Sequence, residues 1–152
     1  MLRLTGPNGQ RLDDYTRAVD VARALVAGGV NVLEFALTGR GALKAISATR
    51  QALGDAACVG VGTVLKSEDA EAAIDAGAEF AVTPTLLRQV IATCVRRPTL
   101  VVCGGFTPTE LLKAHEVGAE LVKVFPAELG KQNSSKQSLR RILSSNWCQP
   151  AA

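Results

Sequence analysis

The segment Val117-Gly-Ala-Glu-Leu-Val-Lys-Val124 decides the fold expected for this chain, because its pattern occurs three times. The other two copies are Ala27-Gly-Gly-Val-Asn-Val-Leu-Glu-Phe35 and Ala76-Gly-Ala-Glu-Phe-Ala-Val-Thr83. Each copy reads as the end of a helix, then a glycine suited to a left-handed helix cap, then an apolar strand. A helix that leads directly into a strand, repeated along the chain, predicts alternating β and α units.

The rest of the sequence follows the same alternation. Five apolar runs rich in β-branched residues predict strands at residues 30–35, 57–61, 80–83, 100–103 and 121–125. Helical patterns lie between them at residues 14–27, 41–53, 67–76, 86–95 and 107–117. Units that recur about every twenty residues predict a parallel sheet, and the interval suits a (β/α)8 TIM-type barrel. A doubly wound sheet is the alternative, but no GxGxxG motif follows the first strand.

Two of the expected helices begin with recognisable signals. Ser67 is followed by two acidic residues, which favour the first turn of a helix. Thr107-Pro-Thr-Glu110 has the pattern of a capping box with proline at the first helical position. The start of the chain is less regular, and residues 2–9 read as a poor strand.

Composition excludes several classes of function. The chain has 152 residues, of which 47% are hydrophobic and 20% charged, as in a single globular domain. The longest apolar runs are far too short to cross a membrane, and a net charge of +3 makes no case for nucleic acid. Four cysteines without CxxC spacing and a single histidine argue against a metal site. Cysteines within apolar runs fit reduced thiols, so we expect a cytoplasmic protein.

Lys123 is the most informative single residue, because it interrupts an apolar strand. Burial of an ammonium group costs several kcal/mol unless the group is paired or loses its proton. A neutral lysine amine is the nucleophile that forms Schiff bases with carbonyl compounds. The alternative is that the side chain follows the strand and its charged end reaches water.

The repeat relates Lys123 to Glu34. Each lies five residues after the glycine of its own repeat, and Val82 has the same place in the middle copy. The three copies supply every second strand, and alternate strands supply one layer of a barrel interior. We therefore expect Glu34 and Lys123 to face each other inside the barrel. Glu34 could act there chemically or serve as an ion-pair partner for the lysine.

With these residues in place, the chain resembles the 2-keto-3-deoxy-6-phosphogluconate (KDPG) and 4-hydroxy-2-oxoglutarate (KHG) aldolases, which are class I aldolases with a (β/α)8 barrel. The resemblance extends from about residue 13 to residue 130. It rests on Leu33-Glu-Phe35, Gly60-Val-Gly-Thr-Val-Leu65, Thr83-Pro84, Gly104 with Thr107-Pro-Thr-Glu110, and Lys123-Val-Phe-Pro-Ala127.

The resemblance implies roles for individual residues. Lys123 matches the lysine that forms the Schiff base, and Glu34 matches the general acid/base. Thr63 matches a residue that binds the pyruvyl carboxylate, and Pro84 matches a residue in the wall of that pocket. Taken alone, Thr63 could equally be a cap or a rim hydroxyl, and Pro84 could be a turn residue.

Basic residues of the family match less closely. Relatives usually carry an arginine four residues after the glutamate, where this chain has Thr38, and Arg40 is the candidate to replace it in gripping substrate anions. Arg11 matches a basic residue at the end of the first strand. The family's proline before Gly104 is replaced here by Cys103.

The implied activity is cleavage of a 2-keto-3-deoxy sugar acid, such as 2-dehydro-3-deoxy-6-phosphogluconate, to pyruvate and an aldehyde such as glyceraldehyde 3-phosphate. The implied partners are a small 2-keto acid and further copies of the chain, since trimers are usual in the family. No metal or organic cofactor is implied.

The resemblance also predicts an incomplete barrel. Relatives continue beyond the Phe-Pro-Ala motif through two more βα units, whose glycine-rich loop and helix N-terminus hold the substrate phosphate. The present sequence supplies five to six units, so we expect a partial barrel domain at residues 1–130 and an atypical polar tail at 131–152.

Two alternatives to an active aldolase remain open at this point. One is an inactive truncated fragment, and the other is a phosphate-binding barrel isomerase or synthase that forms no imine.

Overall fold

Six parallel strands form one curved sheet in the computed structural model, which describes residues 2–3 and 14–126. Each strand pairs with the next strand along the chain, so the spatial order follows the sequence. The strands are β1 (Leu2–Arg3), β2 (Val32–Ala36), β3 (Cys58–Gly62), β4 (Phe80–Val82), β5 (Leu100–Gly105) and β6 (Leu121–Val124).

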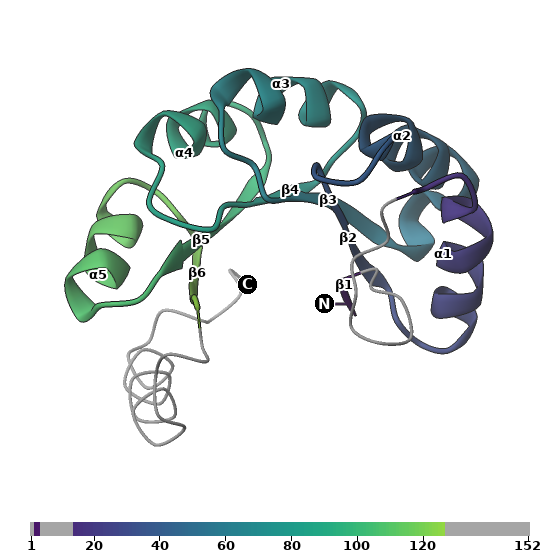
Figure 1. Cartoon of the computed structure of the whole chain (residues 1–152), viewed down its shortest axis with the longest axis horizontal. Helices are drawn as coiled ribbons and strands as arrows, with labels where there is room; N and C mark the ends of the chain where they lie inside the picture. Colours follow the sequence, from purple (N-terminus) through teal and green to yellow (C-terminus); the bar gives the residue numbers. More distant parts are fainter. Residues whose placement is uncertain (1, 4–13, 127–152) are drawn as a thin grey trace.

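The helices all lie on the convex side of this sheet (Figure 1). They are α1 (Ala18–Ala27), α2 (Ala42–Leu53), α3 (Ser67–Asp75), α4 (Arg88–Val95) and α5 (Pro108–Glu116), with a short 3-10 turn η1 (Gly54–Ala56) after α2. A doubly wound sheet would carry helices on both faces. Sequential parallel strands under a single outer layer of helices instead form part of a TIM-type barrel, so the expected fold is confirmed.

The three repeated glycines end their helices in the same way. Gly29, Gly77 and Gly118 have φ angles of 86°, 100° and 100°, which confirms the left-handed caps predicted from the repeat. In each case the glycine amide donates to the carbonyl three residues earlier, and the next amide donates to the carbonyl five residues before itself. This pair of hydrogen bonds defines a Schellman motif. The motif turns the chain sharply from helix to strand, at one fixed distance before β2, β4 and β6.

A carboxylate just after two of these glycines ties neighbouring strands together. Glu79 accepts a hydrogen bond from the Val59 amide at 2.9 Å, and Glu120 accepts one from the Val101 amide, also at 2.9 Å. Both glutamates occupy the same place in the repeat, two residues after the glycine. Each bond links the start of one strand to the start of the strand before it, which helps to set the register.

The main hydrophobic core lies between the sheet and the helices. Its strand residues alternate along the sequence and are fully buried: Leu33, Phe35, Val59, Val61, Ala81, Val101 and Cys103. A smaller cluster on the concave face consists of Phe80, Val82 and Val102, with Val32 and Cys58 packed beside it. Both faces of the sheet are therefore apolar, as expected for parallel strands.

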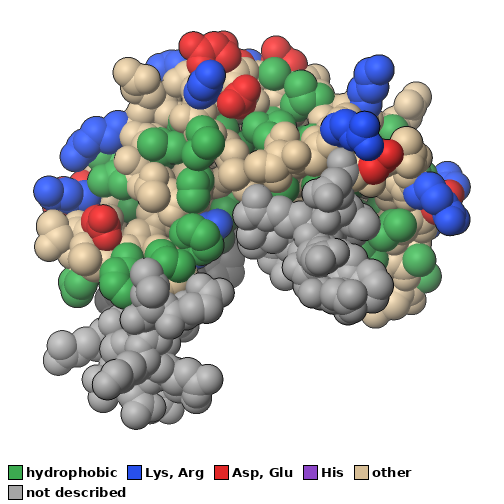
Figure 2. Space-filling view, in the orientation of Figure 1, with side chains coloured by type: hydrophobic (Ala, Val, Ile, Leu, Met, Phe, Trp, Pro, Cys, Tyr) green, Lys and Arg blue, Asp and Glu red, His purple; other side chains and the backbone are tan. Residues whose placement is uncertain are grey.

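The concave face is less well covered at its β5–β6 end. There the side chains of Leu100, Leu121 and Phe125 are 39%, 42% and 39% exposed. Figure 2 shows hydrophobic side chains gathered around this end of the crescent. Interior positions of a barrel become buried only when strands opposite them supply side chains.

Several element boundaries differ from those expected. The first helix begins at Ala18 rather than at residue 14, because the Asp14 carboxylate accepts from the Thr16 amide at 2.9 Å and holds a local turn. The fourth helix begins at Arg88, two residues late. The third helix begins at Ser67 as expected and ends one residue early, at Asp75.

The two ends of the chain were expected to be irregular. Leu2–Arg3 nevertheless pairs in parallel with β2, opposite Leu33 and Glu34. The polar tail predicted at residues 131–152 lies outside the described residues. Within residues 2–3 and 14–126, no helix combines the length and apolar character needed to cross a bilayer.

The capping box at the start of α5 makes a prediction about pH. Backbone hydrogen bonds from Thr107 and Phe106 lower the pKa of Glu110, and the Thr107 hydroxyl adds to the effect. A carboxyl group whose pKa is lower in the folded state stabilises the fold above its unfolded pKa and loses that contribution as the pH falls through the folded pKa. Glu110→Gln should therefore be less stable than the wild type at neutral pH, with a difference that shrinks on acidification. Urea unfolding across the acid range measures this, and a constant difference would contradict it.

Candidate active site

Glu34 is a buried carboxylate on the concave face of the sheet. It lies on β2 and is 1% exposed. Its side chain extends over Gly62 of the neighbouring strand β3, where its Oε1 atom occupies the place that a Cβ atom would take. Only glycine leaves room there, so the absence of a side chain on β3 fixes where the carboxylate lies.

Lys123 belongs to the same face, at the other end of the described sheet. Strand partners in register lie on one face together, as do residues two apart on one strand. Gly62, which lies below the Glu34 carboxylate, pairs with Val82, and Val82 pairs with Val102. Gly104 lies two residues after Val102 on β5 and pairs with Lys123, so all of these residues share one face. The lysine is half-buried, and its Nζ atom lies 5.3 Å from the centre of the Phe125 ring, a cation–π distance. The structure thus places the amine and the carboxylate on the concave face, as the repeat predicts.

Thr63 follows directly after Gly62, at the carboxyl end of β3. Its φ angle is 60°, and it is the only residue other than glycine with a positive φ among the described residues. A β-branched residue in this region is strained by roughly 1–3 kcal/mol, and such strain concentrates at functional sites. The strained turn places Thr63 at the rim of the concave face, beside the strand over which Glu34 extends.

Pro84 lies where the chain leaves β4 and passes over β5. The Pro84 carbonyl oxygen occupies the space that a Cβ atom on Gly104 would need. Because Gly104 is the strand partner of Lys123, the turn at Pro84 lies beside the lysine strand. Thr63 and Pro84 therefore follow the carboxyl ends of β3 and β4, the side on which TIM-type barrels hold their active sites, and Glu34 and Lys123 lie on the concave face of β2 and β6.

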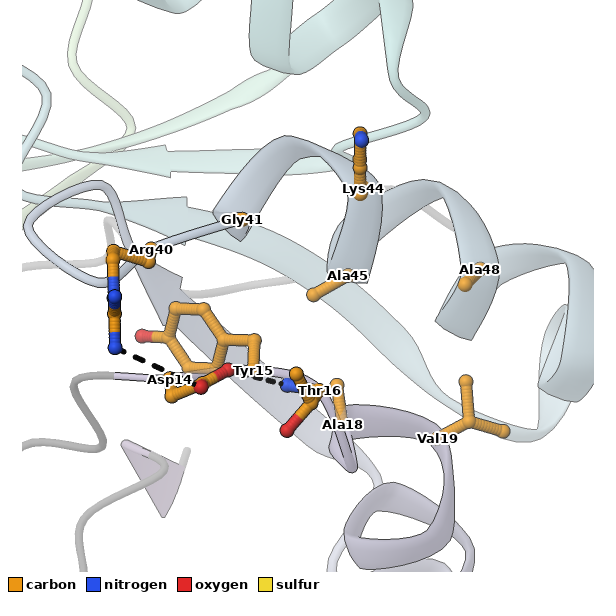
Figure 3. Close-up of a pocket in the computed structure, with 10 residues that line it drawn as sticks. All are labelled: Asp14, Tyr15, Thr16, Ala18, Val19, Arg40, Gly41, Lys44, Ala45 and Ala48. Carbon is orange, nitrogen blue, oxygen red and sulfur yellow. Dashed lines mark hydrogen bonds and ion pairs between the residues drawn. The ribbon is translucent and has the colours of Figure 1, made fainter.

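Arg40 lies away from this group. Its guanidinium is 85% exposed and stands 3.9 Å from the Asp14 carboxylate. The two residues border a pocket of about 470 Å³ between the start of α1 and α2, lined also by Tyr15, Lys44 and small residues (Figure 3). Arg11 lies outside the described residues.

Two glycines at the site were not given a role by the sequence. Gly62 makes room for the Glu34 carboxylate, and Gly104 makes room for the Pro84 carbonyl. The available signal was the spacing of Gly60 and Gly62 on one face of a strand, since glycine inside a strand often marks a close approach. At Gly60 an added Cβ would come within 2.5 Å of the Phe80 ring.

The chemistry open to this arrangement follows from its two polar groups. A lysine amine can add to a carbonyl carbon, and a carboxylate on the same concave face can move the protons that such an addition requires. No group of three or more His, Cys, Asp or Glu side chains suited to a metal ion occurs in the described part of the chain.

A family model described as KDPG and KHG aldolase matches residues 10–138. The chain belongs to this aldolase family. Among curated relatives, the 2-dehydro-3-deoxy-phosphogluconate aldolase of Treponema pallidum is 40% identical over 120 residues, which are 79% of this chain and 55% of that protein. The chain spans about half the length of the curated relatives it matches.

Solved aldolase structures superpose well. The 2-keto-3-deoxy-6-phosphogluconate aldolase of Zymomonas mobilis, solved with 3-phosphoglycerate, has a TM-score of 0.76 at 31% identity and covers 93% of this chain and 63% of that one. The KDPG aldolase from Legionella pneumophila gives a TM-score of 0.76 at 25% identity and covers 96% and 65%. That structure holds pyruvate captured at low pH as a covalent carbinolamine intermediate.

The position of Glu34 can be tested without any assay of activity. Gly62→Ala should lower the free energy of unfolding by about 1–3 kcal/mol, because the new methyl group collides with the Glu34 side chain. Gly28→Ala is the control, since its added Cβ would meet nothing nearer than 3.4 Å. Urea unfolding of both variants measures the difference. Equal stability of Gly62→Ala and the wild type would show that the carboxylate does not lie over β3.

Proposed function

We propose that this chain is the part of a class I aldolase that carries the imine-forming lysine and its proton-transfer carboxylate. The observation that carries the proposal is the shared location of Lys123 and Glu34 on the concave face, near the carboxyl ends of the strands. The substrate would be a 2-keto-3-deoxy sugar acid such as 2-dehydro-3-deoxy-6-phosphogluconate. The products would be pyruvate and an aldehyde such as glyceraldehyde 3-phosphate.

The proposed reaction begins with attack of the neutral Lys123 amine on the C2 carbonyl carbon. Loss of water from the resulting carbinolamine gives a protonated imine, which is an electron sink. The C3–C4 bond then breaks: its electron pair forms an enamine, and the C4 hydroxyl gives up its proton as the aldehyde leaves. Protonation of the enamine at C3 and addition of water to the imine release pyruvate and restore the lysine.

Glu34 is the proposed carrier of these protons, directly or through a water molecule. A carboxylate buried to 1% exposure is held in one place, which general acid/base catalysis requires. Gly62 supports this role, because it gives the carboxylate its space on the neighbouring strand.

The remaining substrate contacts are proposed from the resemblance and from location. Thr63 would bind the pyruvyl carboxylate from the rim of β3, and Pro84 would form the wall of that pocket beside the lysine strand. Arg40 lies on the loop after β2, where it would have to leave Asp14 to reach a substrate anion. Arg11 would add a second cation.

A barrel isomerase or synthase that uses Glu34 and Lys123 without an imine is the second candidate. It shares every geometric feature described above. The two candidates differ in one respect: only the aldolase passes through an intermediate that borohydride can reduce to a stable amine.

Reductive trapping tests the proposal. Incubation with pyruvate and borohydride should add one pyruvyl group to the intact mass, and peptide mapping should place it on Lys123. Lys123→Ala should remove the adduct, whereas Lys113→Ala, at an exposed lysine on α5, should keep it. Glu34→Gln should slow adduct formation about a hundredfold or more, within the range that general acid/base groups contribute. Absence of the adduct from a wild-type protein shown to be folded by circular dichroism would refute the aldolase.

We also propose that the chain self-associates. Leu100, Leu121 and Phe125 expose apolar surface beside β6, which is an edge strand of the sheet within the described residues, and such edges pair readily with other chains. Light scattering after size exclusion should give a mass above that of a monomer, reduced in a Leu121→Ser/Phe125→Ser variant. A monomer in both proteins would refute this.

We propose a cytoplasmic location for the chain, and the free thiols of Cys58, Cys94 and Cys103 fit that location.

A further inference from the structure

The turn after β4 is held by an arrangement that the proposed reaction does not use. This turn, residues 83–85, places the Pro84 carbonyl over Gly104. Two side chains converge on a single atom within it, the carbonyl oxygen of Thr85. The Thr83 hydroxyl donates to that oxygen at 2.8 Å, and the Cys103 thiol donates to it at 3.6 Å.

Both side chains are built into the core. Thr83 and Cys103 are each 0% exposed, so both donors are held within the core, whereas the acceptor residue Thr85 is exposed and the two bonds are partly buried. Backbone bonds hold the base of the turn, from the Thr83 amide to Val102 at 3.0 Å and from the Gly104 amide to Thr83 at 2.9 Å. The tip of the turn has only the two side-chain bonds to Thr85 among the hydrogen bonds of the described residues.

The thiol is also close to the reactive strand. Cys103 pairs with Val122, and the next pair along these strands is Gly104 with Lys123. Burial raises the pKa of the Cys103 thiol, while the Thr83 hydroxyl and the Lys123 charge partly oppose that rise. The thiol therefore keeps its proton at neutral pH and can donate it, either to Thr85 or to the Gly104 carbonyl at 3.4 Å.

We propose that Cys103 is a positioning residue for substrate: with Thr83 it fixes the turn that carries Pro84 against Gly104, and so sets the wall of the keto-acid pocket next to Lys123. This inference rests on the proposed aldolase function. It assigns Cys103 no contact with substrate and no part in the imine chemistry.

Three variants separate a hydrogen-bonding role from simple packing. Cys103→Val fills similar space without a donor, and Cys103→Ser restores a donor. Cys94→Val is the matched control, because Cys94 is equally buried but lies on α4 away from the turn. Hydrogen–deuterium exchange of a peptide covering residues 83–88 measures how firmly the turn is held.

In Cys103→Val, exchange in this peptide should be faster than in the wild type by a factor of up to about five, the factor for loss of one ordinary hydrogen bond, since a thiol is a weak donor. Cys103→Ser should return it toward the wild-type rate, and Cys94→Val should leave it unchanged. The pyruvate concentration that gives half-maximal borohydride trapping should rise several-fold in Cys103→Val, with the trapping rate at saturation nearly unchanged.

Each result bears on a separate claim. Unchanged exchange in Cys103→Val, or an equal increase in Cys94→Val, would refute the claim that Cys103 stabilises the turn at residues 83–85. Faster exchange with an unaltered half-saturating concentration would overturn the role in positioning substrate. If the folded wild type traps no pyruvate, the proposed function fails, the substrate role fails with it, and exchange alone decides whether Cys103 holds the turn.

Discussion

The left-handed glycine at the end of every second helix is the constraint on which the rest of the structure depends. Gly29, Gly77 and Gly118 each close a Schellman motif and start a strand at the same distance beyond it. A shift of one residue would turn every side chain of that strand to the opposite face. The motif therefore decides that Glu34 and Lys123 lie on the concave face and not under the helices.

Space for the site is provided by residues without side chains. Gly62 accommodates the Glu34 carboxylate and Gly104 accommodates the Pro84 carbonyl, so a side chain on β2 and a carbonyl in the turn after β4 each approach the neighbouring backbone closely. The strained φ angle of Thr63 follows one of these glycines directly. Close approach and strain both disfavour folding locally, and the contacts at Gly62 and Gly104 and the strain at Thr63 all lie near the carboxyl ends of the strands. The large apolar contacts on the convex side of the sheet supply the stability that tolerates them.

Much of the fold could be predicted from the sequence, because its signals are local. The glycine repeat, the apolar runs and the Thr107–Glu110 capping box depend on neighbouring residues only, and the structure confirms them. The start of α1 could not be predicted, since the hydrogen bond from the Thr16 amide to the Asp14 carboxylate holds a turn where the residue pattern is also helical. For the site, counting from the glycines placed Glu34 and Lys123 on one face. The role of Gly62, the Glu79 and Glu120 bonds and the exposed position of Arg40 depend on contacts between strands or loops, which a sequence does not display.

A crystal structure of the protein after reduction with pyruvate and borohydride would show whether Lys123 and Glu34 form one reactive site. We expect a pyruvyl group bonded to Lys123 Nζ on the concave face, with the Glu34 carboxylate above Gly62 and within reach of the adduct directly or through one water. An adduct on a different lysine, or a Glu34 side chain turned toward the helices, would contradict it.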